Sequence, residues 1–207
     1  MQKVPYHKAQ EAIIAAIPEG EAPRLLLHAC CGPCSTAVLE KLSQHFRITI
    51  LYYNPNIATE EEYHKREKEV EKLLSLIPQK YPIELISLPW EQEAFLEIAK
   101  GMENIPEGGA RCHKCYELRL RRTAELAARG GYDYFTTTLS ISPLKNAQKL
   151  NEIGETLGEI YGVAHLPSDF KKQEGYKRSV ELSREYGLYR QDYCGCVYSM
   201  KKGEKEE

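Results

Sequence analysis

Residues 24–46 have the sequence RLLLHACCGPCSTAVLEKLSQHF, and this stretch decides the fold that we expect. RLLLH (24–28) is a compact apolar run of strand length, and residues 35–46 follow a helical periodicity. Gly32 and Pro33 separate the two segments. A strand that leads directly into a helix, with three cysteines where they join, is typical of an α/β protein whose ligands bind at the strand ends.

The rest of the chain repeats the alternation of strand and helix. Further strands are expected at 48–54, 83–89 and 132–138. Further helices are expected at 7–17, 59–76, 90–101, 112–129, about 145–160 and about 172–186. The segment 101–111 is predicted to be a loop, and the charged tail 201–207 to be disordered. The alternation predicts a parallel sheet sandwiched by helices, in one domain that covers residues 1–207.

Length and composition limit the classes of protein that fit. The chain has 207 residues, 42% of them hydrophobic and 28% charged, which is ordinary for one globular domain. Its formal net charge of −2 means that binding of an anionic polymer would depend on local basic patches. No stretch approaches the roughly 20 apolar residues of a membrane-spanning helix, and the N-terminal residues lack the pattern of a signal peptide. We therefore expect a cytoplasmic protein with no membrane partner, in which thiols stay reduced.

All seven cysteines fall into three short clusters. The clusters are HACCGPC with Cys30, Cys31 and Cys34, RCHKC with Cys112 and Cys115, and DYCGC with Cys194 and Cys196. Cysteines separated by one or two residues can direct both sulfurs at one metal ion, whereas a cysteine that only packs in a core needs no such spacing. Since the clusters lie far apart in sequence, the fold must bring them together. The pattern indicates metal ligation or redox chemistry.

The residues alone leave three interpretations of the clusters open. CGPC (31–34) at the start of a helix matches the thioredoxin active-site tetrapeptide, which favours thiol–disulfide exchange between Cys31 and Cys34. That interpretation leaves the other cysteines unexplained. The CxxC and CxC pairs suffice for a structural zinc, as in a zinc-stabilised tRNA-binding module. In the third interpretation, four cysteines hold an iron–sulfur cluster, and three remain for a second metal or as a redox pair.

Several longer motifs occur in order between about residues 24 and 199. They are LLLHACCGPCS, YYNPNI followed by EEYHKREKE, RCHKCYELRL, FTTTLSISPLKN, DFKKQEGYKRS and YRQDYCGCVYS. On these motifs, the chain resembles the epoxyqueuosine reductase QueH family over nearly its whole length. All three cysteine clusters of the family pattern are filled in this sequence.

The resemblance implies a fold similar to the adenine-nucleotide alpha-hydrolase (HUP-like) type of α/β sandwich. It implies an oxidoreductase that works without cobalamin and reduces the epoxide of epoxyqueuosine to queuosine at the wobble position of tRNA, the final step of queuosine biosynthesis. It also implies a [4Fe–4S] cluster with a second metal ion, iron or zinc, beside it. The electrons must come from an external donor. We assign all seven cysteines to these metals, with Asp169 as a further candidate ligand of the second metal.

Removal of an epoxide oxygen also consumes protons, so a proton donor is expected near the metals. Asp169 precedes a basic segment, Tyr193 lies next to a cysteine, and His28 ends the first strand. Each has a structural alternative, as a helix cap, a packed ring and a core histidine respectively. Binding of tRNA requires basic residues near the site. The candidates are Arg111, Lys114, Arg119, Lys171 and Lys172.

Overall fold

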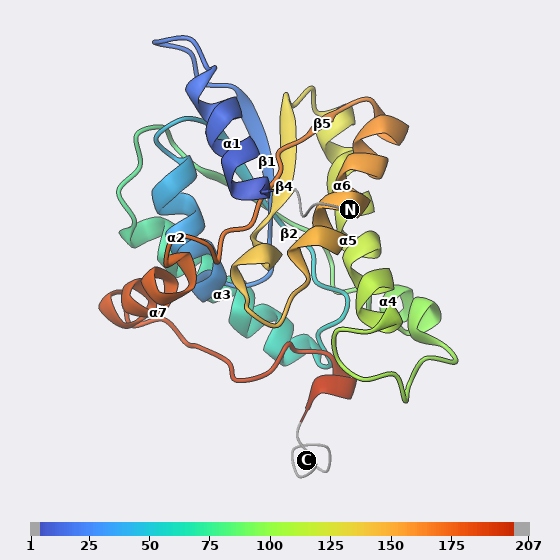
Figure 1. Ribbon diagram of the computed structural model, residues 1–207. Coiled ribbons are helices and arrows are strands. Elements are labelled where there is room, and N and C mark those ends of the chain that lie inside the picture. The colour runs from blue at the N-terminus through green and yellow to red at the C-terminus, as the bar shows by residue number, and fades with distance from the viewer. Residues whose placement is uncertain (1–4, 201–207) are drawn as a thin grey trace.

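The structure of the protein is a computed structural model that describes residues 5–200. Within these residues, five parallel strands form one sheet at the centre of the protein (Figure 1), and their order is β3–β2–β1–β4–β5. The strands are β1 (Arg24–Ala29), β2 (Arg47–Tyr52), β3 (Glu84–Ser87), β4 (Tyr134–Thr137) and β5 (Ala164–His165). The helices are α1 (Tyr6–Ala15), α2 (Gly32–Leu42), α3 (Glu60–Leu76), α4 (Gln92–Ala99), α5 (Ala110–Arg129), α6 (Ala147–Tyr161) and α7 (Gly175–Glu185). Two short 3-10 helices are η1 (Thr138–Ile141) and η2 (Val197–Ser199).

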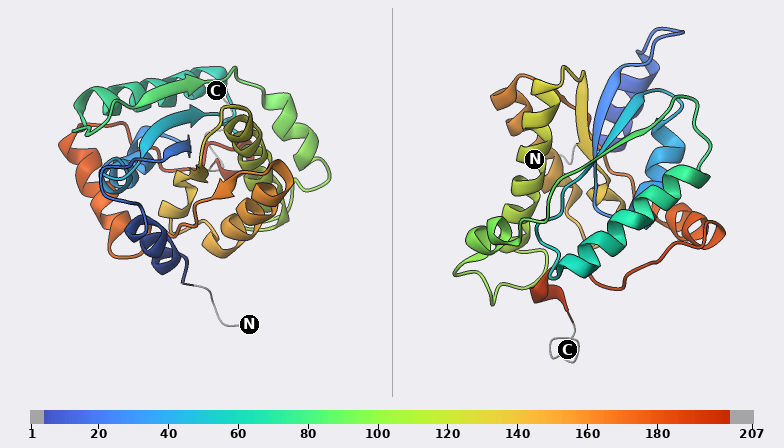
Figure 2. Two further views of the ribbon diagram at one scale, coloured as in Figure 1. Left: turned by 90° about the horizontal axis from the view of Figure 1, so that it is seen from above. Right: turned by 180° about the vertical axis from the view of Figure 1, so that it is seen from behind.

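The central strand supplies side chains to two hydrophobic cores, one on each face of the sheet. Leu25, Leu27 and Ala29 of β1 belong to the core that packs against α2 and α3. Leu26 of the same strand belongs to the core beneath α5 and α6. Figure 2 shows the helices on both sides of the sheet. Both faces of a parallel sheet are apolar when its crossover helices cover them. The predicted fold class, a parallel sheet sandwiched by helices, is confirmed.

The order of strands reverses its direction at β1. The chain first adds β2 and β3 on one side of β1, and later adds β4 and β5 on the other side. Leu26 lies opposite Thr49 of β2 and opposite Phe135 of β4, so β1 has a parallel neighbour on each side. In sheets of this kind, ligands bind at the carboxyl ends of the two strands that flank such a reversal. Cys30 and Cys31 follow β1 at that place, as the sequence predicts.

The boundaries of two elements at this edge differ from the prediction for local reasons. α2 begins at Gly32 instead of residue 35, because Pro33 in the first helical turn needs no partner for a backbone N–H. β4 ends at Thr137, whose hydroxyl accepts a hydrogen bond from the Leu139 N–H at 3.1 Å and caps η1. Cys31 therefore stands at the N-cap position of α2 and Cys34 in its first turn, beside a 3-10 turn.

The remaining differences are small. The sequence does not predict β5, because a pair of residues, Ala164–His165, carries no strand periodicity of its own. α5 begins at Ala110, so the predicted loop at 101–111 is shorter and Arg111 is helical. The predicted disorder of 201–207 concerns residues outside those that the structure describes. Within residues 5–200, no helix is both long and apolar enough to cross a lipid bilayer.

Candidate metal centre

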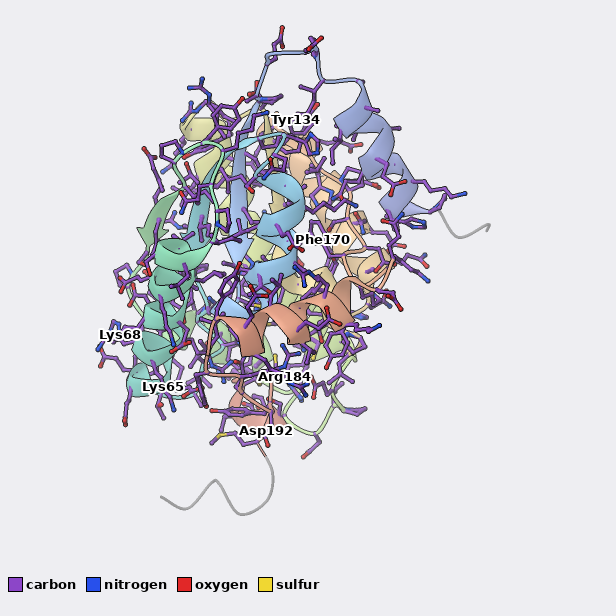
Figure 3. The ribbon with its side chains drawn as sticks, turned by 90° about the vertical axis from the view of Figure 1, so that its left-hand side faces the viewer. Lys65, Lys68, Tyr134, Phe170, Arg184 and Asp192 are labelled. Carbon is purple, nitrogen blue, oxygen red and sulfur yellow. The ribbon has the colours of Figure 1, made fainter. Side chains whose placement is uncertain are left out.

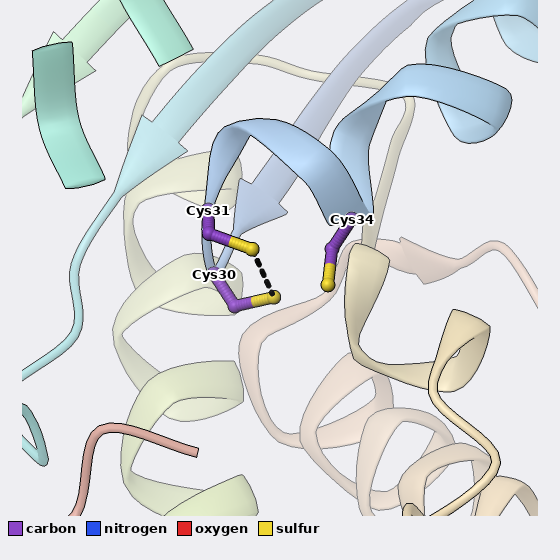
Figure 4. Close-up of side chains that lie close together, drawn as sticks. All are labelled: Cys30, Cys31 and Cys34. Carbon is purple, nitrogen blue, oxygen red and sulfur yellow. Dashed lines mark hydrogen bonds between the residues drawn. The ribbon is translucent and has the colours of Figure 1, made fainter. Parts of the chain in front are cut away.

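The three cysteines of the first cluster converge at the carboxyl end of β1 (Figure 4). Cys30 and Cys31 follow the strand, and Cys34 lies in the first turn of α2. Their sulfur atoms all lie within 4.8 Å of one another, with 3.9 Å between Cys30 Sγ and Cys31 Sγ. Sulfur atoms at this spacing can bind one metal ion, and the dipole of α2 favours thiolates at its N-terminus. This group is a candidate metal site.

Neighbouring elements hold the first cluster in place. Thr138, at the start of η1, accepts a hydrogen bond from the Cys30 N–H at 3.2 Å and donates its hydroxyl to Cys30 Sγ at 3.4 Å. Gly32 lets the start of α2 approach α3 closely, because a Cβ at this position would lie 2.5 Å from the Glu69 carbonyl oxygen. The polar residues after β4 therefore share the edge of the sheet with the cysteines and contact one of them directly.

The acidities of the three thiols differ. Hydrogen bonds from Cys30 and Cys34 lower the pKa of Cys31 well below its ordinary value. The hydrogen bond to Cys31 raises the pKa of Cys30. Hydrogen bonds to Cys30 and Cys31 likewise raise the pKa of Cys34. One thiolate is thus stabilised by two thiols that keep their protons. A metal ion would replace these protons, because thiolates are its ligands.

The other four cysteines line a second, smaller cavity. Cys112 and Cys115 come from the first two turns of α5, and Cys194 and Cys196 come from the segment before η2. The remaining lining residues are Phe95, Arg111, Tyr116, Arg119 and Lys145. We call this space the four-cysteine cavity. Four sulfurs are the donor set of a structural zinc site or of an iron–sulfur cluster. The fold therefore joins two clusters that are distant in sequence, as expected.

Arg66 holds the turn that carries the last two cysteines. From α3, its Nη1 donates a hydrogen bond to the Cys194 carbonyl oxygen at 3.1 Å. Its guanidinium also lies 5.1 Å from the centre of the Tyr193 ring. Gly195 has a φ of +101°, and a Cβ there would lie 2.8 Å from Nη1 of Arg66. The CGC sequence therefore needs its glycine both for the backbone conformation and for the approach of this arginine.

A larger pocket of about 580 Å³ lies between the two groups of cysteines. Its lining includes Cys30 and Cys34 of the first group and Cys194 of the second. Asp192, which also lines the pocket, and Tyr134, at the start of β4, lie towards opposite ends of the molecule (Figure 3). The pocket is therefore at the carboxyl ends of the strands. Its volume lies in the range of small-molecule sites and suffices for a nucleoside.

Lys145 is a buried cation between the pocket and the four-cysteine cavity. Its Nζ lies 3.2 Å from Cys194 Sγ and 3.0 Å from Glu107 Oε1, and its side chain is only 7% exposed. Burial alone would lower the pKa of Lys145, but the Cys194 sulfur, Tyr116 and the Glu107 carboxylate outweigh burial and raise it. The ammonium group therefore stays charged and donates a hydrogen bond to sulfur.

Arg119 is a second buried cation at the same place, with 1% of its surface exposed. Its Nε donates to the Cys115 carbonyl oxygen at 3.2 Å, and its Nη1 lies 3.5 Å from Asn54 Oδ1. Nη2 has no hydrogen-bond partner among the described residues. Burial would lower the pKa of this guanidinium, but Cys115, Cys194 and Cys30 outweigh it and raise the pKa. Sulfur atoms of both groups therefore lie within electrostatic reach of Arg119.

The structure corrects the prediction that Arg111 and Arg119 belong to a basic surface. Both side chains are buried on the inner side of α5. Nη1 of Arg111 donates to the carbonyl oxygens of residues 102, 103 and 105, and its guanidinium lies 4.5 Å from the centre of the Tyr198 ring. These arginines stabilise the surroundings of the four-cysteine cavity, because a basic run on a helix includes residues of its buried side.

The three predicted RNA-binding lysines are more accessible than the arginines. Lys114 and Lys172 are exposed. Lys171 is half-buried, with its Nζ 2.8 Å from Asp169 Oδ1 and 3.4 Å from the Lys145 carbonyl oxygen. Lys171 therefore lies next to a residue that lines the pocket. The role of these lysines in RNA binding stays a prediction.

The three predicted proton donors lie in different places. Tyr193 lines the pocket, whereas Asp169 lines a separate cavity beside α2 and α7 and does not join the three-cysteine group. His28 is fully buried, with Nδ1 2.8 Å from Thr137 Oγ1 and Nε2 3.0 Å from the Tyr53 carbonyl oxygen. Because a carbonyl only accepts, Nε2 carries the proton, and burial lowers the pKa of His28 to about 4. This geometry gives His28 a structural role, because its ring links β1 to β4 and to the residue that follows β2.

Two residues of the centre lie outside the predicted sets of cysteine ligands, proton donors and RNA contacts. Arg66 and Lys145 touch the segment of Cys194, one through its carbonyl oxygen and the other through its sulfur. Both belong to motifs that carry the family resemblance, EEYHKREKE and SPLKN. Membership of these motifs is the signal that points to them, since neither is close to a cysteine in sequence.

The fold and the site define an α/β protein with a cysteine-lined centre where the strand order reverses. The family described as epoxyqueuosine reductase QueH matches residues 25–202. Epoxyqueuosine reductase QueH of Staphylococcus epidermidis is 44% identical over 98% of this chain and 87% of its own length. The protein of the same name from Streptococcus pyogenes is 41% identical over 97% of this chain and 80% of its own length. The chain belongs to the epoxyqueuosine reductase QueH family, and the predicted resemblance and oxidoreductase class are confirmed.

The chain also matches solved structures, one of which is a tRNA-modifying enzyme. The U34-tRNA thiolase NcsA from Methanococcus maripaludis, described with its [4Fe-4S] cluster, matches with a TM-score of 0.48 and 9% identity. The match covers 94% of this chain and 68% of that chain.

Proposed function

We propose that the protein reduces the epoxide of epoxyqueuosine at the wobble position of tRNA to queuosine, the final step of queuosine biosynthesis. The observation that carries the proposal is the pocket of about 580 Å³ between two groups of cysteines, in a chain of the epoxyqueuosine reductase QueH family. The reaction consumes two electrons and two protons and releases water. An external donor supplies the electrons, and the pocket holds the modified base.

The four-cysteine cavity suits a [4Fe–4S] cluster, with Cys112, Cys115, Cys194 and Cys196 as proposed ligands. Support comes from the donor set and from the two buried cations beside it, Arg119 and Lys145. Buried cations are unfavourable without an anion, and four thiolates around an iron–sulfur core form one. When bound, such a cluster supplies electrons one at a time.

The three-cysteine group suits a second metal ion, iron or zinc, with Cys30, Cys31 and Cys34 as proposed ligands. Cys30 and Cys34 line the pocket, while Cys31 is fully buried behind them. When bound, a metal ion with an open position supplies Lewis-acid activation of an oxygen atom in the pocket. Thr138 holds Cys30 by two hydrogen bonds and thereby fixes the position of one ligand.

Tyr193 is the proposed proton donor for the leaving oxygen. It lines the pocket, and burial together with Glu62 raises the pKa of its phenol. The hydroxyl is therefore protonated at neutral pH. The nearby guanidinium of Arg66, 5.1 Å from the ring centre, fixes the orientation of the ring. A phenol held in this way can give its proton to an oxygen anion that forms in the pocket.

Lys114, Lys171 and Lys172 are the proposed contacts to tRNA phosphates. Lys171 and Lys172 are neighbours in sequence. Lys171 lies near the pocket, because its Nζ is 3.4 Å from the carbonyl oxygen of Lys145, which lines the pocket. Phosphate contacts of this kind position the RNA without reading its sequence. The wobble base has to leave the stacked anticodon loop to enter the pocket, as in other enzymes that modify bases.

The experiment is conversion of epoxyqueuosine in tRNA by anaerobically reconstituted protein with a chemical reductant. Digestion to nucleosides and mass spectrometry measure the loss of one oxygen atom. Cys194→Ser and Cys31→Ser should abolish conversion, and Tyr193→Phe should slow it, whereas Tyr81→Phe is a matched control away from the pocket. Unchanged tRNA with fully loaded wild-type protein would refute the proposal. Disulfide reduction by metal-free protein, lost in Cys34→Ser, would favour thiol–disulfide exchange instead.

A further inference from the structure

Three residues line both the larger pocket and the four-cysteine cavity: Arg119, Lys145 and Cys194. They form the shared wall between the two spaces. Two of them are buried cations, with only 1% of Arg119 and 7% of the Lys145 side chain exposed. A buried cation is unfavourable unless an anion or several acceptors compensate it. The shared wall therefore requires negative charge nearby.

Carboxylates supply only part of this charge. Lys145 pairs with Glu107 at 3.0 Å, but the Glu107 side chain is 36% exposed and remains partly solvated. Arg119 forms no ion pair with a carboxylate within residues 5–200; its hydrogen bonds go to the Cys115 carbonyl and to Asn54. Its Nη2 is buried without a partner in the same part of the chain. One full positive charge is thus left without an acid.

The sulfur atoms are the anions that fit. Lys145 Nζ lies 3.2 Å from Cys194 Sγ, which is the distance of a charge-assisted hydrogen bond to sulfur. Arg119 is fixed to the helical turn of Cys115 through the carbonyl of that cysteine. Four thiolates carry more negative charge than an iron–sulfur core neutralises, and reduction adds one electron more. Cations beside the ligands therefore stabilise the reduced form more than the oxidised form.

Resting on the proposed function, we propose that Arg119 and Lys145 are positioning residues that compensate the charge of a cluster in the four-cysteine cavity and raise its reduction potential. Lys145 acts through its N–H···S hydrogen bond to Cys194. Arg119 acts through its charge and its unpartnered Nη2. Because both also line the larger pocket, they would place the compensating charge on the side of the four-cysteine cavity that faces this pocket.

The test compares reduction potentials of reconstituted variants, measured by anaerobic redox titration with electron paramagnetic resonance. Lys145→Met and Arg119→Met should each lower the equilibrium constant for one-electron reduction at least tenfold, which corresponds to about 59 mV. Lys149→Met and Arg121→Met are matched controls, because they remove a half-buried basic side chain from α6 and an exposed one from α5, and neither residue lines the pocket or the four-cysteine cavity. The controls should keep the potential of the wild type.

Charge-conserving variants separate charge from shape. Lys145→Arg and Arg119→Lys should keep the potential closer to that of the wild type than the methionine variants do. If a methionine variant takes up no cluster, its reduction potential is not measurable, and the iron and sulfide contents of the charge-conserving variant at the same position are compared with those of the wild type instead. Normal loading of the charge-conserving variant then supports the inference, and failure of that variant overturns it.

Three results would overturn the inference or the proposed function separately. Unchanged potentials in both loaded methionine variants overturn the inference. A wild-type protein that takes up no iron and sulfide also overturns it, whatever the activity. Loaded wild-type protein that shows the expected shifts but leaves epoxyqueuosine unchanged overturns the proposed function alone.

Discussion

Replacing Gly195 by alanine tests whether the C-terminal turn positions the four-cysteine cavity. Gly195 has a φ of +101°, and an added Cβ would lie 2.8 Å from Nη1 of Arg66. The same Nη1 donates to the Cys194 carbonyl oxygen at 3.1 Å. Since Arg66 is buried, its side chain has little room to move away. The substitution therefore strains the backbone and also displaces the group that holds Cys194.

The two effects add to each other. Backbone strain at such a φ costs about 1–3 kcal/mol. Loss of the hydrogen bond from a charged donor costs about 1.5–3 kcal/mol more. Gly20→Ala is the matched control, because Gly20 has a φ of +86° and no atom within 4 Å of the added Cβ. It should show only the strain. The difference between the two variants is therefore about 1.5–3 kcal/mol, or roughly a tenfold to hundredfold loss of metal affinity.

The assay is competition with a chelator, followed by the absorbance of the reconstituted iron–sulfur protein under anaerobic conditions. Urea unfolding of both metal-free variants measures the cost to the fold in parallel. Gly195→Ala should release iron at a much lower chelator concentration than Gly20→Ala. Equal retention of iron by the two variants would refute the argument that Arg66 and the glycine turn position Cys194.

Further predictions concern pH, packing and RNA binding. Burial lowers the pKa of His165 from its ordinary 6.5 to about 3, so the folded state binds fewer protons and loses stability as pH falls from 6.5 towards 3. At pH 5 this cost is at most about 2 kcal/mol, and urea unfolding at pH 7 and pH 5 should show a smaller difference in His165→Gln. A Cβ on Gly154 would overlap the His165 ring, so Gly154→Ala should lower the melting temperature, and an unchanged value would contradict this packing. Replacing Lys114, Lys171 and Lys172 by alanine together should weaken tRNA binding and flatten its dependence on salt; an unchanged slope in a filter-binding assay would exclude them as phosphate contacts.

The sequence predicts the sheet well because its strands and helices differ in length and periodicity. Most residues of β1 and β2 are apolar, and every residue after the first is buried, which is the pattern of central strands of a parallel sheet. β5 escapes prediction because the tertiary fold alone aligns Ala164 and His165 with β4. The cysteine spacings predict metal ligation, but spacing does not say which clusters share a site. The cysteines divide into a group of three and a group of four because the tertiary fold brings the segment before η2 next to the start of α5.

The sequence does hold a signal that would have separated the buried arginines from the exposed lysine on α5. Arg111, Cys115 and Arg119 are spaced by four residues, so they share one face of the helix. If Cys115 faces a metal inside the protein, both arginines lie on the buried face with it, and Lys114 does not. No such periodicity connects Lys145 to a cysteine, because it lies between η1 and α6 and meets Cys194 only through the fold. The position of a charged side chain relative to a cysteine can thus be predicted when both lie on one helix. When they lie on segments that are distant in sequence, as Lys145 and Cys194 do, their contact is found only in the structure.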